Sequence, residues 1–171
     1  MGATLVALII EGESAHVAEV GDSRAYVLRR GELTQITKDQ TQIQILLDQG
    51  LLTPETAKLS RAKNIVLQAI GKTPDLIVAQ RRLGLRDGDR LLLCSDGLTG
   101  HVADAEIAQV LGSATSLAHA CAQLVTMTNE RGGRDNVTVI AASIAGGARG
   151  HETVEQTLTT IRAFSVGEGA P

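Results

Sequence analysis

Short apolar runs separated by glycine-containing turns make up the first 37 residues. The runs are Ala3–Ile10, Ala15–Val20, Arg24–Arg30 and Leu33–Thr37, and the turns are Glu11–Gly12–Glu13, Gly21–Asp22–Ser23 and Gly31–Glu32. Neighbouring runs of this length, joined by such tight turns, are typical of antiparallel hairpins. The pattern therefore predicts a β meander over residues 2–37.

The spacing of apolar residues changes after residue 40. Within Ile43–Leu47 they recur at helical spacing, and Gly50 ends this pattern. Thr53–Pro54 is a typical helix start, because threonine caps the first free amides and proline fits the first helical position. With a third short turn expected over residues 64–70, residues 40–75 are predicted to form a helical excursion between strands.

The β pattern resumes after this excursion. It gives strands Leu76–Leu83 and Arg90–Cys94, then amphipathic helices Asp104–Leu111 and Ser116–Arg131, and a closing strand Val137–Ile144. Leu91–Cys94 is apolar at every position, which indicates a strand buried on both faces. Strands that pair with their chain neighbours, together with these helices, predict an α+β fold.

The C-terminal segment differs in composition from the rest of the chain. The glycine-rich stretch after Ala145 is interpreted as a linker, and Glu152–Phe164 is expected to form a weak, exposed helix. Residues 166–171 are expected to be disordered. We therefore place one domain at residues 1–144 and a linker and tail at residues 145–171.

Composition narrows the class of protein. The 171 residues are enough for one domain with its own core, and 43% of them are hydrophobic. The formal net charge of −3 argues against a nucleic-acid binder. Aromatic residues, at 1%, also offer few stacking platforms for single-stranded nucleic acid.

The cysteines and the apolar segments indicate the compartment. Cys94, in a buried strand, and Cys121, in a helix, are interpreted as small hydrophobic residues in a reducing environment. No apolar segment approaches the length of a membrane span, and no basic segment precedes the first apolar run. We therefore expect a cytoplasmic protein without membrane insertion.

Three aspartates lie beside or close to glycine at the ends of predicted strands. They are Asp22 after Ala15–Val20, Asp96 after Arg90–Cys94, and Asp135 before Val137–Ile144. A charge at the end of a buried strand must reach water, a partner or a metal. Taken singly, each is also interpretable as a plain turn residue. Taken together, oxygen ligands of this kind suit hard cations such as Mg²⁺ or Mn²⁺.

The motifs around these aspartates resemble those of the metal-dependent protein phosphatase 2C family. The matching stretches are GDSR at 21–24, SDGL at 95–98 and GGRDNVTV at 132–139, with weaker matches at Met1–Leu5, Thr37–Thr41 and Asn64–Gly71. The stretches occur in the family's order, and the resemblance runs from residue 1 to about Ile144. It implies an antiparallel β-sandwich flanked by helices and incomplete at its N-terminus.

The resemblance implies hydrolysis of phosphoserine and phosphothreonine on proteins by a two-metal centre that contains Mn²⁺ or Mg²⁺. Asp96 and Asp135 match the aspartates that hold one metal ion, and Asn136 matches a neighbour that orders metal-bound water. Asp22 matches a ligand of a third, weaker metal site. Gly100 stands where that site has its second carboxylate in the family, so we expect the third site to be weakened.

Other motifs of the family have no counterpart in this sequence. They include the aspartate that bridges both metals, a histidine general acid and an arginine that holds the phosphate. Without them we expect the activity of this chain alone to be impaired. The family's missing helices and strands also imply an exposed apolar sheet face and unpaired strand edges.

Three interpretations remain open. The chain is a phosphatase 2C-type domain that lacks part of its catalytic apparatus, or a catalytically inactive module that binds phosphoproteins or another partner. Alternatively, it is one chain of a split enzyme, completed by a missing N-terminal portion or a second chain. The reading frame upstream of Met1 distinguishes a truncated enzyme from the others.

Overall fold

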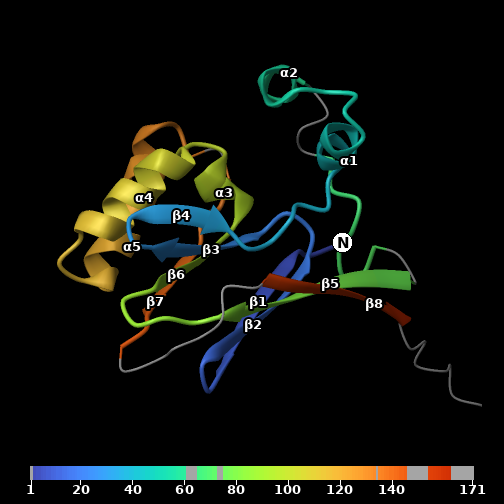
Figure 1. Cartoon of the computed structure of the whole chain (residues 1–171). Coiled ribbons are helices and arrows are strands. Elements are labelled where there is room, and N and C mark those ends of the chain that lie inside the picture. Colours follow the sequence, from blue (N-terminus) through green and yellow to red (C-terminus); the bar gives the residue numbers. More distant parts are fainter. Residues whose placement is uncertain (1, 61–64, 73–74, 134, 146–153, 163–171) are drawn as a thin grey trace, which may run out of the picture.

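The computed structural model of the chain describes residues 2–57, 60, 65–72, 75–133 and 135–145, together with the backbone of residues 58–59 and 154–162. These residues form two four-stranded antiparallel sheets, one with strand order β1-β2-β5-β8 and the other with order β4-β3-β6-β7 (Figure 1). The strands are β1 Leu5–Glu11, β2 Ser14–Val20, β3 Arg24–Arg29, β4 Glu32–Gln35, β5 Asp75–Gly84, β6 Arg90–Cys94, β7 Val139–Ser143 and β8 Val154–Arg162.

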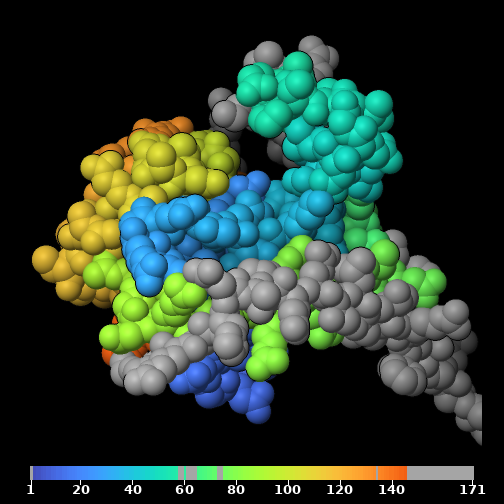
Figure 2. Space-filling model, viewed as in Figure 1, coloured from blue at the N-terminus to red at the C-terminus, as the bar shows by residue number. Residues whose placement is uncertain are grey.

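The helices fall into two groups. They are α1 Gln42–Asp48, α2 Pro54–Leu59, α3 Asp96–Thr99, α4 Asp104–Ser113 and α5 Leu117–Glu130. Helices α3, α4 and α5 lie together beside the β4-β3-β6-β7 sheet, whereas α1 and α2 stand apart from both sheets (Figure 1 and Figure 2). The chain therefore has the predicted α+β fold. Among the described helices, none is long and apolar enough to cross a membrane.

The two central strands of the β4-β3-β6-β7 sheet, β3 and β6, are buried on both faces. Tyr26 and Leu92 belong to the core that this sheet forms with the helices, which includes Leu111. Val27 and Leu91 belong to a second core, between the two sheets. Because alternate side chains of a strand point to opposite faces, β3 and β6 need apolar residues on both sides. The two-sided burial predicted for β6 is confirmed.

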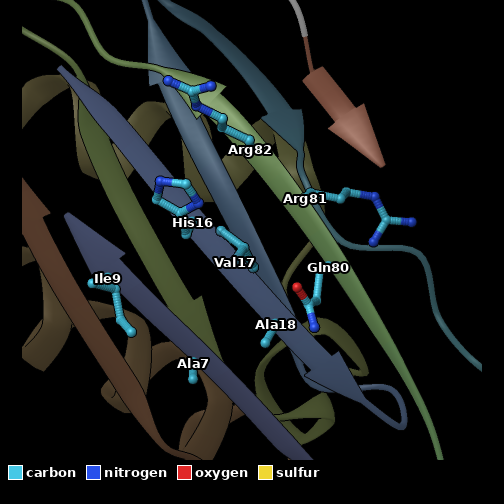
Figure 3. A pocket seen from close by; sticks show the side chains of 8 residues that line it. All are labelled: Ala7, Ile9, His16, Val17, Ala18, Gln80, Arg81 and Arg82. Atoms are coloured by element: carbon cyan, nitrogen blue, oxygen red, sulfur yellow. The ribbon is translucent and has the colours of Figure 1, made fainter. Parts of the chain in front are cut away.

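The outer face of the β1-β2-β5-β8 sheet carries exposed apolar side chains. Leu5 is 47% exposed and Ile9 is 67% exposed. Beside Ile9, the residues His16, Gln80 and Arg82 border a shallow hollow of about 340 Å³ (Figure 3). Exposed apolar side chains are therefore present on this face, as expected, but polar side chains lie beside them.

Helices α1 and α2 agree with the helical excursion predicted after residue 40. The hydroxyls of Thr41 and Thr53 each accept a hydrogen bond from the backbone amide three residues later, and Pro54 begins α2. The structure describes every residue of α1, and none of them is buried. For α1, the local cap therefore contributes more than core packing does.

The helix predicted at Glu152–Phe164 is wrong. Within it, Val154–Arg162 forms strand β8, which pairs antiparallel with β5 from Asp75 to Leu83. The segment is rich in valine, isoleucine and threonine, whose branched β-carbons favour strands over helices. Residues 146–153 and 163–171, which hold the predicted linker and the stretch predicted to be disordered, lie outside the described residues.

The third short turn predicted over residues 64–70 is wrong for residues 65–70, and residue 64 lies outside the described residues. Val66 forms a β bridge with Thr41, and Ile70 forms one with Ala3. The amide of Ala3 donates to the carbonyl of Ile70 at 3.1 Å, and the reverse bond is 2.8 Å. Pairing with distant segments satisfies this backbone in place of a local helical turn.

Gly97, in the short helix α3 that follows β6, touches the loop before β7. A β-carbon at this position would lie 2.5 Å from the backbone oxygen of Asn136 and 3.4 Å from the α-carbon of Val137. The loop backbone therefore occupies the space that a side chain would need. This close approach holds together the two segments that carry Asp96 and Asp135.

Gly97→Ala is expected to lower the free energy of unfolding by about 1–3 kcal/mol, because the added methyl group displaces the Asn136 backbone. Gly112→Ala is the matched control, since its β-carbon would meet only Leu28 Cδ2, at 3.8 Å, and the residue lies in α4. We expect that control to be neutral or up to about 1 kcal/mol stabilising. Urea unfolding measures both, and a Gly97→Ala chain as stable as wild type would contradict the close packing.

Candidate metal centre

Strand register brings the predicted metal ligands to one edge of the β4-β3-β6-β7 sheet. Cys94, the last residue of β6, pairs with Arg24 at the start of β3 and with Val139 at the start of β7. The candidate ligands are Asp22 just before β3, Asp96 just after β6 and Asp135 in the loop before β7. Antiparallel pairing thus places three distant parts of the chain at the same end of the sheet.

Asp22 lies in the corner between β2 and β3 and is 8% exposed. Gly21 beside it has a φ of +104° and lies against Thr4, whose Cγ2 would be 2.4 Å from an added β-carbon. Gln40 fixes the corner with two hydrogen bonds. Its side-chain Oε1 accepts from the backbone amide of Gly21 at 2.7 Å, and its backbone amide donates to the carbonyl of Gly21 at 2.8 Å.

Asp96 is the first residue of α3, which follows β6 almost directly. Between them, the amide of Ser95 donates to the carbonyl of Thr138 at 3.1 Å. The Ser95 hydroxyl donates to the carbonyl of Asn136 at 3.1 Å and accepts from the amide of Thr138 at 3.0 Å. These contacts tie the start of α3 to the loop that carries Asp135.

Asp135 is exposed, and its Oδ1 accepts from the amide of Asn136 at 2.7 Å. The loop that holds both residues begins at Arg131, whose guanidinium donates to the two carboxylate oxygens of Glu106 at 2.6 and 2.8 Å. Arg131 also donates to the carbonyl of His101 at 2.9 Å. The loop is therefore anchored beside α3. The role of the Asn136 side chain in ordering water stays a prediction.

The candidate ligands affect one another electrostatically. The pKa of Asp22 is raised to about 6, first by burial and then by the negative charges of Asp96 and Asp39. The pKa of Asp96 is raised by burial and then by the charge of Asp135. Asp96 therefore lies within electrostatic reach of both other aspartates. The raised pKa values also mean that the fold disfavours these carboxylates in their charged form.

A divalent cation suits this arrangement. Within the part of the chain that the structure describes, none of the three aspartates forms an ion pair with a basic side chain. A cation would offset their mutual repulsion, and carboxylate oxygens are the ligands that Mg²⁺ and Mn²⁺ prefer. The same described residues contain no group of three or more His, Cys, Asp or Glu side chains placed to hold one ion. They therefore supply at most two such ligands to any single ion.

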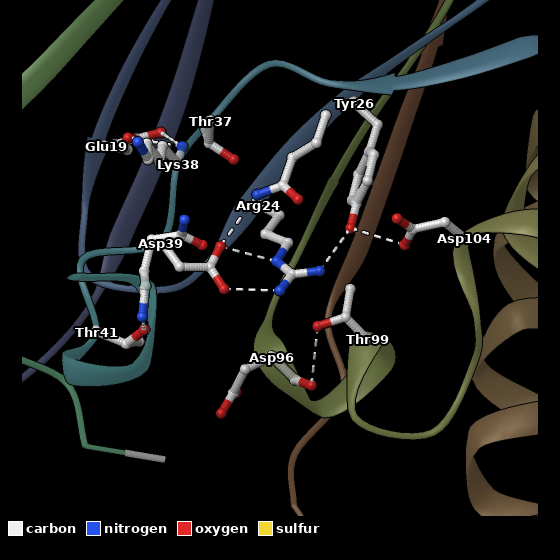
Figure 4. Close-up of polar contacts among 12 residues, drawn as sticks. Glu19, Arg24, Tyr26, Thr37, Lys38, Asp39, Thr41, Asp96, Thr99 and Asp104 are labelled. Carbon is white, nitrogen blue, oxygen red and sulfur yellow. Dashed lines mark hydrogen bonds and ion pairs between the residues drawn. The ribbon is translucent and has the colours of Figure 1, made fainter. Parts of the chain in front are cut away.

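A polar network of Arg24, Asp39, Tyr26 and Asp104 lies beside this edge, and the sequence patterns do not predict it (Figure 4). Arg24 pairs with Asp39 at 2.7 Å, and the hydroxyl of Tyr26 donates to Asp104 at 3.2 Å. Asp39 belongs to Thr37–Thr41, which the sequence analysis notes only as a weak match. The one indication in the sequence is non-local: the predicted hairpin between β3 and β4 places the start of β3 beside residues that follow β4.

Comparison with known proteins points to one family. The family model described as Protein phosphatase 2C matches residues 1–44. Serine/threonine protein phosphatase PstP of Mycobacterium tuberculosis is 41% identical over 145 residues, which is 84% of this chain and 28% of that protein. Serine/threonine phosphatase stp of Listeria innocua is 39% identical over 140 residues, 82% of this chain and 56% of that protein.

Solved structures give the same result. The crystal structure of PstP/Ppp from Mycobacterium tuberculosis matches with a TM-score of 0.81 at 39% identity, over 85% of this chain and 61% of that chain. The PstP catalytic domain in complex with two manganese ions matches with a TM-score of 0.74 at 40% identity, over 85% of this chain and 60% of that chain. The chain thus spans 56% of the length of the Listeria relative and 28% of that of PstP. Its fold, its three motifs and these relatives show that the chain belongs to the protein phosphatase 2C family of serine/threonine phosphatases.

Proposed function

We propose that this chain provides part of the catalytic centre of a metal-dependent phosphatase that acts on phosphoserine and phosphothreonine in proteins. The observation that supports this most is the position of Asp96, within electrostatic reach of Asp22 and Asp135 at one sheet edge. Unaided hydrolysis of phosphate monoesters is among the slowest reactions known, and cations accelerate it by neutralising charge. Free Cys94 and Cys121 accord with action in the cytoplasm.

Each candidate residue has a distinct proposed role. Asp96 and Asp135 hold one Mn²⁺ or Mg²⁺ ion, Asn136 orders water beside it, and Asp22 belongs to a third, weaker site. When bound, paired cations supply the activation of water and the neutralisation of phosphoryl oxygens. The contacts of Ser95 hold the residue before Asp96 against the loop that carries Asp135. The manganese complex of the PstP catalytic domain supports Mn²⁺ as the first ion to test.

The chain alone is proposed to have impaired activity. Its described residues offer at most two carboxylates to one ion, and Gly100 stands where the third site of the family has its second carboxylate. The chain also spans only 56% of the Listeria relative. The remaining ligands are proposed to come from a further N-terminal portion or from a second chain.

A phosphoprotein-binding module without turnover is the second candidate function. The same small ligand set favours it, because a single cation attracts a phosphate group without supplying the second charge that hydrolysis requires. This candidate and the incomplete enzyme differ in one respect. Only the enzyme gains turnover when the missing ligands are supplied.

The direct test is Mn²⁺ titration of the purified 171-residue chain, together with hydrolysis of p-nitrophenyl phosphate and of a phosphothreonine peptide. We expect Mn²⁺ binding with little or no turnover. Asp96→Ala or Asp135→Ala is expected to abolish the binding, and Asp22→Ala to weaken it less. Glu32→Ala, at an exposed position that begins β4, is the control and is expected to change nothing.

Addition of the N-terminal portion of a relative as a separate chain separates the two candidates. Turnover that appears only after this addition supports the incomplete or split enzyme, and its absence supports the binding module. Robust turnover by the chain alone, abolished in Asp96→Ala, would contradict the incomplete site. A chain that binds no Mn²⁺ would contradict the metal centre itself.

Asp22→Asn is expected to raise the free energy of unfolding of the metal-free chain by about 1–2 kcal/mol at neutral pH. The physical reason is that the fold buries this carboxylate near other negative charges, which is a cost that an amide avoids. Asp135→Asn, at an exposed position, is the control and should change stability little. Urea unfolding in EDTA measures the free energy of unfolding of both variants. A destabilised Asp22→Asn chain would contradict the claim that the buried Asp22 carboxylate destabilises the fold.

A further inference from the structure

Arg24 brings a positive charge to the edge where the candidate metal ligands lie. It is the first residue of β3, two positions after Asp22, and its side chain is 26% exposed. Burial and neighbouring carboxylates raise the pKa of Asp22, and the charge of Arg24 opposes this rise. The guanidinium is therefore within electrostatic reach of a carboxylate that is proposed to bind a cation.

Asp39 engages this guanidinium through two parallel hydrogen bonds (Figure 4). Nε of Arg24 donates to Oδ1 at 2.8 Å, and Nη2 donates to Oδ2 at 2.7 Å. This two-bond geometry is among the strongest that arginine forms with a carboxylate. Gln35 donates a further bond to Oδ1 at 3.0 Å, and the Asp39 side chain is only 14% exposed. Asp39 is therefore a fixed acceptor.

Tyr26 engages the remaining side of the guanidinium. Nη1 of Arg24 donates to the Tyr26 hydroxyl at 3.0 Å, and that hydroxyl donates to Asp104 Oδ1 at 3.2 Å. Tyr26 is 1% exposed, and Asp104 is the first residue of α4. The network thus commits Nε, Nη1 and Nη2 to Asp39 and Tyr26.

A guanidinium without these partners would compete with a metal ion, because both bind carboxylate oxygens. We propose that Asp39 is a positioning residue whose ion pair with Arg24 keeps the guanidinium from binding Asp22 and Asp96, and so leaves these carboxylates available to a divalent cation. The inference rests on the proposed metal centre. It adds a second requirement for cation binding: the neighbouring Arg24 side chain must be paired with Asp39, a carboxylate that is not itself a candidate ligand.

Mn²⁺ titration by isothermal calorimetry, with variants of the pair in the 171-residue chain, tests this inference. Asp39→Asn releases Arg24 and is expected to weaken Mn²⁺ binding about tenfold. Asp39→Asn combined with Arg24→Gln removes the competing charge and is expected to restore binding to within about threefold of wild type. A purely structural role predicts no such rescue, because the double variant also lacks the ion pair.

The other end of β3 offers a matched control. Arg29 donates to Asp89 with the same two-bond geometry, from Nε at 2.9 Å and from Nη2 at 2.7 Å. Arg29 lies about 16 Å along the strand from Arg24, at about 3.3 Å per residue. Asp89→Asn therefore disrupts an equivalent pair away from the metal edge, and it is expected to lower stability without changing Mn²⁺ affinity.

The outcomes separate this inference from the proposed function. If wild type binds Mn²⁺ and Asp39→Asn binds it equally well, the inference is overturned and the metal centre stands. A double variant that binds no better than Asp39→Asn, or an Asp89→Asn chain that is equally weakened, also overturns the inference. A wild-type chain that binds no Mn²⁺ overturns both. Circular dichroism checks that each variant folds. If Asp39→Asn folds poorly, Asp39→Glu is the second variant: it keeps the negative charge and is expected to retain Mn²⁺ binding, and a loss of binding in a folded Asp39→Glu chain would overturn the inference.

Discussion

The pairing of Cys94 with Arg24 on one side and with Val139 on the other is the constraint on which the candidate site depends. It fixes the end of β6 against the starts of β3 and β7, so that chain segments more than 40 residues apart share one sheet edge. A shift of one residue in either register would turn the flanking side chains to the opposite face. Two-sided burial of β6 makes such a shift costly, and this burial therefore stabilises the geometry of the site.

Gathering carboxylates at this edge has an electrostatic cost. Burial and the charge of Asp96 raise the pKa of Asp22 to about 6, and burial and the charge of Asp135 raise that of Asp96. Elsewhere in the fold, buried acidic groups have basic partners: Glu19 accepts from Arg81 at 2.6 Å, and Asp89 pairs with Arg29 at 2.7 Å. The edge with the candidate metal ligands departs from this pattern, in the way that functional sites often do.

Much of the fold follows from local pattern. The apolar runs locate β1 to β7 to within a few residues, and the Thr53–Pro54 start of α2 is visible in the sequence because its cap is local. The prediction fails where pairing with distant segments decides the structure, as in β8 and residues 65–70. At the site, Gly21 beside Asp22 marks a sharp turn and Gly97 beside Asp96 marks a close approach, whereas the nearest glycine to Asp135 is two residues away. The partnership of Arg24 with Asp39 has no such local mark, since it depends on the hairpin between them.

Strand register is proposed to create a cation site at one edge of the sheet. Anomalous diffraction at the manganese absorption edge, from crystals of the 171-residue chain grown with MnCl₂, tests it most directly. We expect an anomalous peak within coordination distance of the carboxylates of Asp96 and Asp135. Manganese found only at other positions, or these carboxylates turned away from one another with no peak between them, would contradict it.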